Sequence, residues 1–221
     1  IWIQGEDKLP EKYKNSVAGY RAMTSGYRLW DHTQILKLIQ TEEYRWLLPL
    51  FESYPHWIMK VDLAKYVILH KYGGIYVDMD TIIQGSFEPL TAEKSLVIIE
   101  NVTDDKQLWI FTFITTFTNN HFLYSPYSRH PFITEILKLA SRSATRMFYE
   151  FKLWYIMDSI GPNLLYNVAM SHPHLVKLVD SKEIRKYFIH ENHLTWFSFD
   201  NHDKILVFIM LMFAALVIKA Y

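Results

Sequence analysis

The chain has 221 residues, enough for one large domain, and half of them are hydrophobic, which allows a substantial core. Its 23 basic and 23 acidic side chains leave no formal net charge. This balance argues against a nucleic-acid-binding protein with a broad basic surface. Because the sequence contains no cysteine, disulfides and thiolate metal sites are both excluded.

The N-terminal quarter predicts two strands and two helices. The chain begins on Ile1 rather than Met, so we expect that its true N-terminus is missing. The opening "IWIQG" predicts a strand that ends in a glycine turn, and residues 10–23 predict a short amphipathic helix. Aromatic and polar residues alternate over 27–31, which predicts a second strand, and residues 35–51 predict a further helix.

The segment "WIMKVDLAKYVILHKYGG", residues 57–74, gives the clearest helical signal in the chain. Its apolar residues recur at helical spacing, and Gly73 and Gly74 supply a stop. The β-branched and aromatic residues of "IYVDMD", residues 75–80, then predict a strand. A helix, a double glycine and an apolar strand therefore precede the acidic pair that ends this segment.

The remaining elements continue the alternation of strands and helices. Residues 95–99 and 187–192 predict strands, whereas 132–144 and 161–173 predict helices. This alternation predicts an α/β sandwich around a mainly parallel sheet.

Two aspartates, Asp78 and Asp80, stand one residue apart at the end of the predicted strand. Residues at this spacing in a strand point to the same face, about 6–7 Å apart along the chain. Ligands of open α/β sheets bind outside the carboxyl ends of strands, and paired carboxylates there suit Mg²⁺ or Mn²⁺. The pattern predicts a metal that bridges the protein and a diphosphate; the alternative is a solvated strand end with Asp78 capping a turn.

The stretch "VDLAKYVILHKYGGIYVDMD" resembles the DXD-containing sugar-binding region of one glycosyltransferase family. That family is related to the yeast initiating α-1,6-mannosyltransferase and to the inositol-phosphoceramide mannosyltransferases. The residues that match its pattern are Asp62, Tyr66, Leu69, Gly73, Gly74, Tyr76, Asp78 and Asp80. Val61 replaces the usual serine and Lys65 the usual arginine, and lysine keeps the charge but loses the bidentate fork.

The resemblance extends over most of residues 1–197. "NHFLYSPYSRHPF", residues 120–132, is similar to the family's Asn…His-Pro-Phe stretch, and "IGPNLL", residues 160–165, resembles its Gly-Pro turn. "YFIHENHLTW", residues 187–196, resembles its closing pattern. These motifs occur in the family's order.

The resemblance implies a GT-A fold, a nucleotide-diphospho-sugar transferase fold with a Rossmann-like sandwich. It also implies transfer of a hexose, mannose or similar, with retention and with Mn²⁺ or Mg²⁺. By family position, Asp80 binds the metal directly and Asp78 contacts the donor ribose or the metal through water, which makes these two the catalytic candidates. His190 is the third metal-ligand candidate.

Four further residues are substrate-binding candidates by family position. Asp62 and Lys65 are expected to contact the nucleotide sugar, although an ordinary surface ion pair at i,i+3 spacing is the alternative. Asn120 lies in a matching stretch. Trp196 is expected to form a wall near the donor, with a place in the core as its alternative.

The C-terminal tail differs from the rest of the chain. We expect a glycosyltransferase domain over residues 1–199 and a hydrophobic tail over 200–221. Residues 205–218 are all apolar, fewer than the ~20 that a membrane helix needs, so a buried core helix is the alternative to a membrane segment. Lys204 and Lys219 flank the run and suit a membrane boundary. A membrane segment would place the protein on a membrane, such as Golgi or another secretory membrane.

Two other functions compete with a glycosyltransferase. A phosphatase or phosphotransferase can also use a D-x-D pair at a strand end, and a non-catalytic membrane-anchored module could bind sugar nucleotides without turning them over. The partners expected for the leading hypothesis are a nucleotide-diphosphate sugar and a glycan or lipid acceptor, with no nucleic acid.

Overall fold

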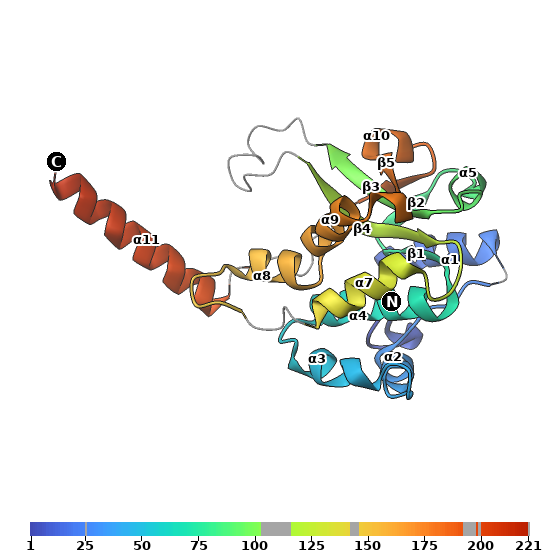
Figure 1. Cartoon of the computed structure of the whole chain (residues 1–221), viewed down its shortest axis with the longest axis horizontal. Coiled ribbons are helices and arrows are strands. Elements are labelled where there is room, and N and C mark those ends of the chain that lie inside the picture. The colour runs from blue at the N-terminus through green and yellow to red at the C-terminus, as the bar shows by residue number, and fades with distance from the viewer. Residues whose placement is uncertain (25, 103–115, 142–145, 192–197, 199, 221) are drawn as a thin grey trace.

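The structure is a computed structural model that describes residues 1–24, 26–102, 116–141, 146–191, 198 and 200–220 (Figure 1). Its α-helices are α1 (Glu11–Met23), α2 (His32–Ile39), α3 (Leu48–Ser53), α4 (Trp57–Tyr72), α5 (Glu88–Thr91), α7 (Pro131–Ala140), α8 (Lys152–Ser159), α9 (Pro162–Ser171), α10 (Ser181–Ile184) and α11 (Asn201–Ala220). Its strands are β1 (Gly74–Val77), β2 (Thr81–Ile83), β3 (Leu96–Val102), β4 (Thr116–Ser125), β5 (Val176–Asp180) and β6 (Phe188–His190).

Four strands form one sheet in the order β1-β4-β3-β5, and β2 pairs with β6 in a separate ribbon. β4 runs antiparallel to both β1 and β3, and only β3 and β5 pair in parallel among the described strands. The predicted α/β class is confirmed, but the prediction of a mainly parallel sheet is wrong. The reason is β4, whose mixture of threonine, asparagine, histidine and apolar residues did not mark it as a strand, and which inserts between β1 and β3.

Residues 96–99 of strand β3, in the interior of the sheet, are buried on both faces. Leu96 and Ile98 of β3 belong to the larger apolar cluster with α4, α7 and α9, whereas Val97 and Ile99 belong to a second cluster with residues of α1, α5, α10 and β6. Successive strand residues point to opposite faces, and these four are at most 1% exposed. Two covered faces explain why residues 96–99 form an unbroken apolar run.

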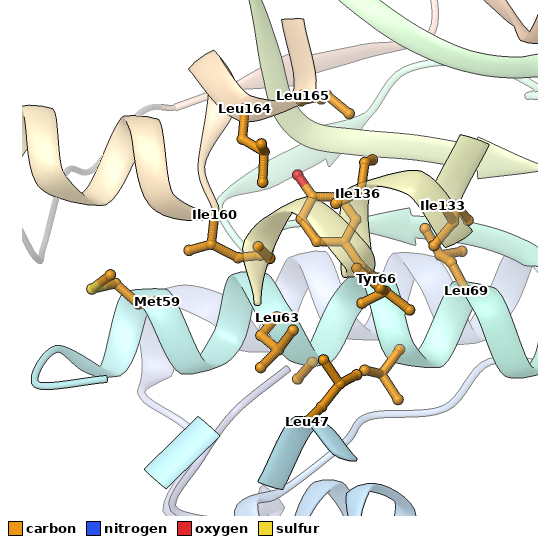
Figure 2. Close-up of a cluster of buried hydrophobic side chains, with 14 of the residues drawn as sticks. Leu47, Met59, Leu63, Tyr66, Leu69, Ile133, Ile136, Ile160, Leu164 and Leu165 are labelled. Atoms are coloured by element: carbon orange, nitrogen blue, oxygen red, sulfur yellow. The ribbon is translucent and has the colours of Figure 1, made fainter. Parts of the chain in front are cut away.

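Helix α4 lies at the centre of the larger cluster (Figure 2). Apolar side chains of α4, α7 and α9 meet there: Leu63, Tyr66, Leu69, Ile133, Ile136, Leu164 and Leu165. The helix ends at Tyr72, and Gly73 and Gly74 have φ angles of 68° and 89°. A Cβ on Gly73 would lie 2.9 Å from the backbone carbonyl carbon of Tyr127, so only glycine fits this helix-to-strand turn.

The two N-terminal strands predicted from the sequence do not form. The segments do lie side by side, since the Trp2 amide donates to the Trp30 carbonyl at 2.9 Å and the His32 amide to the Ile3 carbonyl at 3.3 Å. These bonds join the two segments without the repeating ladder that defines a strand.

The predicted helix over residues 35–51 is divided into α2, a short 3₁₀ turn (Arg45–Leu47) and α3. α2 begins with a capping box between Asp31 and Gln34. Pro49 lies in the first turn of α3, where its missing N–H leaves no helical bond unmade, whereas it would break a continuous helix.

Helix α11 projects away from the rest of the molecule (Figure 1). Its first turn is tied to the body through Asp203, which is 1% exposed. The Asp203 carboxylate accepts hydrogen bonds from Arg146 at 2.5 Å and from the Lys152 amide at 2.7 Å. Beyond this turn, Ile205, Phe208 and Leu211 are more than half exposed. Within the described part of the chain, no helix combines the length and hydropathy required to cross a membrane.

Candidate metal and donor site

Asp78 and Asp80 lie in a tight turn between β1 and β2, not in a strand. The Asp78 amide donates to the His121 carbonyl of β4 at 2.8 Å, and the Thr81 amide donates back to the Asp78 carbonyl at 3.2 Å. The expectation that strand alternation aligns the two carboxylates is therefore wrong. The turn brings them together instead, directly after the carboxyl end of β1.

His190 reaches the same place from the other end of the chain. It ends β6, where it pairs with Thr81 of β2. Its Nε2 lies 3.1 Å from Oδ1 of Asp80, and the two side chains are 17% and 16% exposed. One ligand atom each of Asp78, Asp80 and His190 lies within 4.8 Å of the others. The three candidates for the metal site thus converge.

The chemistry of this group fits a divalent cation. Carboxylate oxygens suit Mg²⁺ and Mn²⁺, and an imidazole nitrogen suits transition metals. Two neighbouring carboxylates repel each other, and a cation between them would relieve that repulsion. The group is thus suited to Mn²⁺ and, through its oxygens, to Mg²⁺.

Tyr76 orients one of the carboxylates. Its hydroxyl donates to Oδ1 of Asp78 at 2.6 Å, and the residue is 8% exposed. In the sequence, Tyr76 matches the family pattern but is not among the predicted site residues. The two-residue spacing between Tyr76 and Asp78 was the available signal for this contact.

Asp62 and Lys65 form a buried ion pair on α4. Lys65 Nζ lies 2.6 Å from Asp62 Oδ1, and the side chains are 1% and 3% exposed, respectively. Burial raises the pKa of Asp62, and the positive charge of Lys65 opposes that shift. The alternative of an ordinary surface ion pair is therefore excluded.

Asn120 completes this pair. Its backbone carbonyl accepts from Lys65 Nζ at 3.1 Å, and its side-chain amide donates to Asp62 Oδ1 at 3.3 Å. Lys65 Nζ also lies 5.2 Å from the centre of the Tyr76 ring. Three of the four substrate-binding candidates, Asp62, Lys65 and Asn120, thus form one network. This network contacts Tyr76, whose hydroxyl donates to Asp78.

The fourth candidate, Trp196, lies outside the described residues. One residue of the site went unnoticed in the sequence: His121, whose ring stacks on that of His190 with 4.1 Å between centroids. Its position beside Asn120 was the only available signal, since nothing in the local pattern distinguishes a histidine that packs from one that serves a site.

The sequence of the chain is similar to those of known glycosyltransferases. Residues 10–97 match the family described as the glycosyltransferase sugar-binding region containing DXD motif. The chain is 28% identical over 165 residues to inositol phosphoceramide mannosyltransferase 1 of Schizosaccharomyces pombe, covering 72% of this chain and 47% of that protein. It is 39% identical over 88 residues to mannosyl phosphorylinositol ceramide synthase SUR1 of Saccharomyces cerevisiae, covering 39% of this chain and 23% of that protein.

The chain spans less than half the length of these two relatives. Among solved structures, the PaToxG glycosyltransferase is 17% identical and aligns with a TM-score of 0.47 over 77% of this chain and 66% of its own. The α/β architecture with a mixed sheet is consistent with a GT-A-like fold. The family resemblance inferred from the sequence motifs is confirmed.

Proposed function

Because residues 10–97 carry the sugar-binding region of the DXD-containing glycosyltransferases, we propose that this chain is the catalytic region of a metal-dependent retaining glycosyltransferase. It transfers a hexose from a nucleotide-diphosphate sugar to an acceptor. The observation that carries the proposal is the convergence of Asp78, Asp80 and His190 within 4.8 Å at the end of β1.

The three residues would hold Mn²⁺ or Mg²⁺. When bound, the cation supplies Lewis-acid stabilisation of the negative charge on the departing diphosphate. The chain itself orients the site: the Tyr76 hydroxyl fixes Asp78, and the pairing of β2 with β6 places His190 beside Asp80. Asp62, Lys65, Asn120 and Trp196 are the proposed contacts to the nucleotide sugar.

The names of the relatives support a choice of donor and acceptor. Inositol phosphoceramide mannosyltransferase is a mannosyltransferase named for a lipid acceptor. We extend this to a mannose-like donor sugar and a lipid or glycan acceptor for the present chain. A lipid acceptor favours work at a membrane surface, and the exposed apolar residues of α11 suit such a surface, in a Golgi or other secretory membrane.

The test is a panel of nucleotide-diphosphate sugars incubated with the purified chain in Mn²⁺, in Mg²⁺ or in EDTA. The measurements are nucleoside diphosphate release and sugar transfer to inositol phosphoceramide. We expect metal-dependent release from one sugar donor and no cleavage of a phosphomonoester such as p-nitrophenyl phosphate. Phosphomonoester cleavage instead would favour the phosphatase alternative, and donor binding without turnover would favour the non-catalytic module.

A further inference from the structure

His121 touches the candidate metal site in two ways. Its backbone carbonyl accepts the Asp78 amide at 2.8 Å. Its ring is nearly parallel to that of His190, with 4.1 Å between centroids and 15° between planes. From β4, His121 therefore contacts both the turn that carries the aspartates and the strand that carries His190.

The His121 ring is packed but not hydrogen-bonded. The residue is 5% exposed, and its ring meets the edge of Phe188 at 5.5 Å and 90°. Neither ring nitrogen has a hydrogen-bond partner among the described residues. Leaving buried polar groups unpaired destabilises the fold, so these nitrogens do not explain what the ring contributes.

The His121 ring also lies outside the ligand group itself. The described residues whose ligand atoms all lie within 4.8 Å of one another are Asp78, Asp80 and His190. What the geometry offers is a flat ring face against the face of His190. Hydrogen-bonding partners that fix the orientation of a metal-binding imidazole typically change metal affinity 10–100-fold when they are removed, and for a ring held by stacking we use the lower end of that range.

We propose that His121 is a positioning residue, whose flat ring fixes the plane of the His190 imidazole so that Nε2 stays beside Asp80 and ready for a divalent cation. This inference rests on the proposed metal site. In this proposal, the flat shape of the His121 ring orients His190, and the ring nitrogens of His121 play no part.

The test uses Mn²⁺ alone as the probe and measures its dissociation constant by the EPR signal of free Mn²⁺. Two variants keep most of the side-chain volume: His121→Phe keeps a flat ring, and His121→Leu does not. We expect His121→Phe to bind Mn²⁺ within about threefold of wild type and His121→Leu to bind about tenfold more weakly. His121→Phe should be at least as stable as wild type to urea, because it removes two unpaired polar atoms.

A double-mutant cycle with His190→Ala separates positioning from a general loss of structure. In that background, His121→Leu should weaken Mn²⁺ binding no further, because there is no imidazole left to hold. Wild-type affinity in both His121 variants, or an equal loss in both, would overturn the proposal. If the wild-type chain itself does not bind Mn²⁺, the proposed metal site fails and this inference fails with it; if it binds and His121→Leu binds equally well, only this inference fails.

Discussion

Asp80 and His190 are 110 residues apart in the sequence, yet Nε2 of His190 lies 3.1 Å from Oδ1 of Asp80. The contact depends on the ribbon in which Thr81 faces His190. Among the described residues, three residue pairs form this ribbon, and a slip of one residue would turn His190 to the opposite face. The position of His190 in the candidate site therefore depends on the register in which β2 and β6 pair.

Substituting Asp80 should abolish metal-dependent donor turnover while the fold survives. Asp80→Asn removes one carboxylate of the pair and with it the repulsion toward Asp78, so stability in the absence of metal should hold or rise. Donor turnover and urea unfolding are the two measurements, and Asp7→Asn, at an exposed position, is the control. Near-wild-type turnover in Asp80→Asn would contradict the metal-site assignment.

Breaking the buried ion pair should destabilise the protein strongly. Lys65→Met leaves the Asp62 carboxylate buried without its partner, which typically costs about 3–5 kcal/mol of unfolding free energy. The double variant Asp62→Asn/Lys65→Met should be more stable than the sum of the single effects predicts, because no charge is then left buried. Urea denaturation measures both quantities.

A matched control is the exposed i,i+3 pair of Glu11 and Lys14, whose side chains are 86% and 56% exposed. Lys14→Met should cost less than about 1 kcal/mol. A similar small effect for Lys65→Met would mean that the buried pair contributes little.

The conservative Lys65→Arg restores the usual family residue, and we expect it to keep or improve donor affinity by offering a bidentate grip.

Removing the Tyr76 hydroxyl should lower the affinity of the site for a metal without leaving a cavity in the core. Tyr76→Phe keeps the ring but deletes the hydrogen bond to Asp78, so we expect Mn²⁺ affinity to fall about tenfold. Tyr72→Phe, at a position that is 56% exposed, should leave affinity unchanged. Equal affinities of the two variants would show that the hydroxyl does not orient Asp78.

Glu43 should make the stability of the fold depend on acid pH. Hydrogen bonds from Lys71 and Arg129 lower the pKa of Glu43 from 4.5 to about 2. Because this pKa is lower in the folded state, the contribution of Glu43 is fully present above about pH 4.5 and is lost as pH falls toward 2. The effect should be modest, since the partly exposed pairs are screened by salt.

Unfolding of wild type and Glu43→Gln should be compared between pH 2 and 7. We expect wild type to be the more stable at neutral pH and the difference to close as pH approaches 2. Glu42→Gln, at an exposed neighbouring position, should show no such trend. A difference that is constant with pH would argue against the pKa shift as its source.

Truncation of α11 tests its apolar part, which begins at Ile205, separately from its first turn, which contains Asp203. A chain that ends at Lys204 keeps the bonds of Asp203 to Arg146 and Lys152, so it should stay folded and active. We also expect it to lose binding to lipid vesicles, as measured by flotation, because Ile205, Phe208 and the following apolar residues are gone. Unfolding or aggregation of this shorter chain would instead show that the removed segment belongs to the core.

Asp203→Ala in the full-length chain tests the contacts of the first turn of α11 alone. It should cost about 1–3 kcal/mol of unfolding free energy, because it removes the hydrogen bonds that Arg146 and the Lys152 amide donate to a buried carboxylate. Vesicle binding should persist in this variant, since the apolar length of α11 remains.

The sequence by itself determined the elements whose signals are local. The helix over 57–74 was predictable because its apolar residues repeat at helical spacing and Gly73 and Gly74 end it, and the observed α4 agrees. The acidic pair was likewise predictable from residue order, whereas His190 was predicted only through the family resemblance. The helical spacing, the glycine stop and the paired aspartates are signals that depend only on neighbours along the chain.

Only the tertiary structure decided how those residues meet. β4 has a mixed composition, so its place at the centre of the sheet, and the antiparallel pairing that follows, came from contacts distant in sequence. The burial of Lys65 and the stacking of His121 on His190 depend on which elements pack above them. The spacing of apolar residues and the local composition describe one chain segment at a time. The candidate site, in contrast, is formed by side chains from segments that are distant in sequence and meet only in the folded chain.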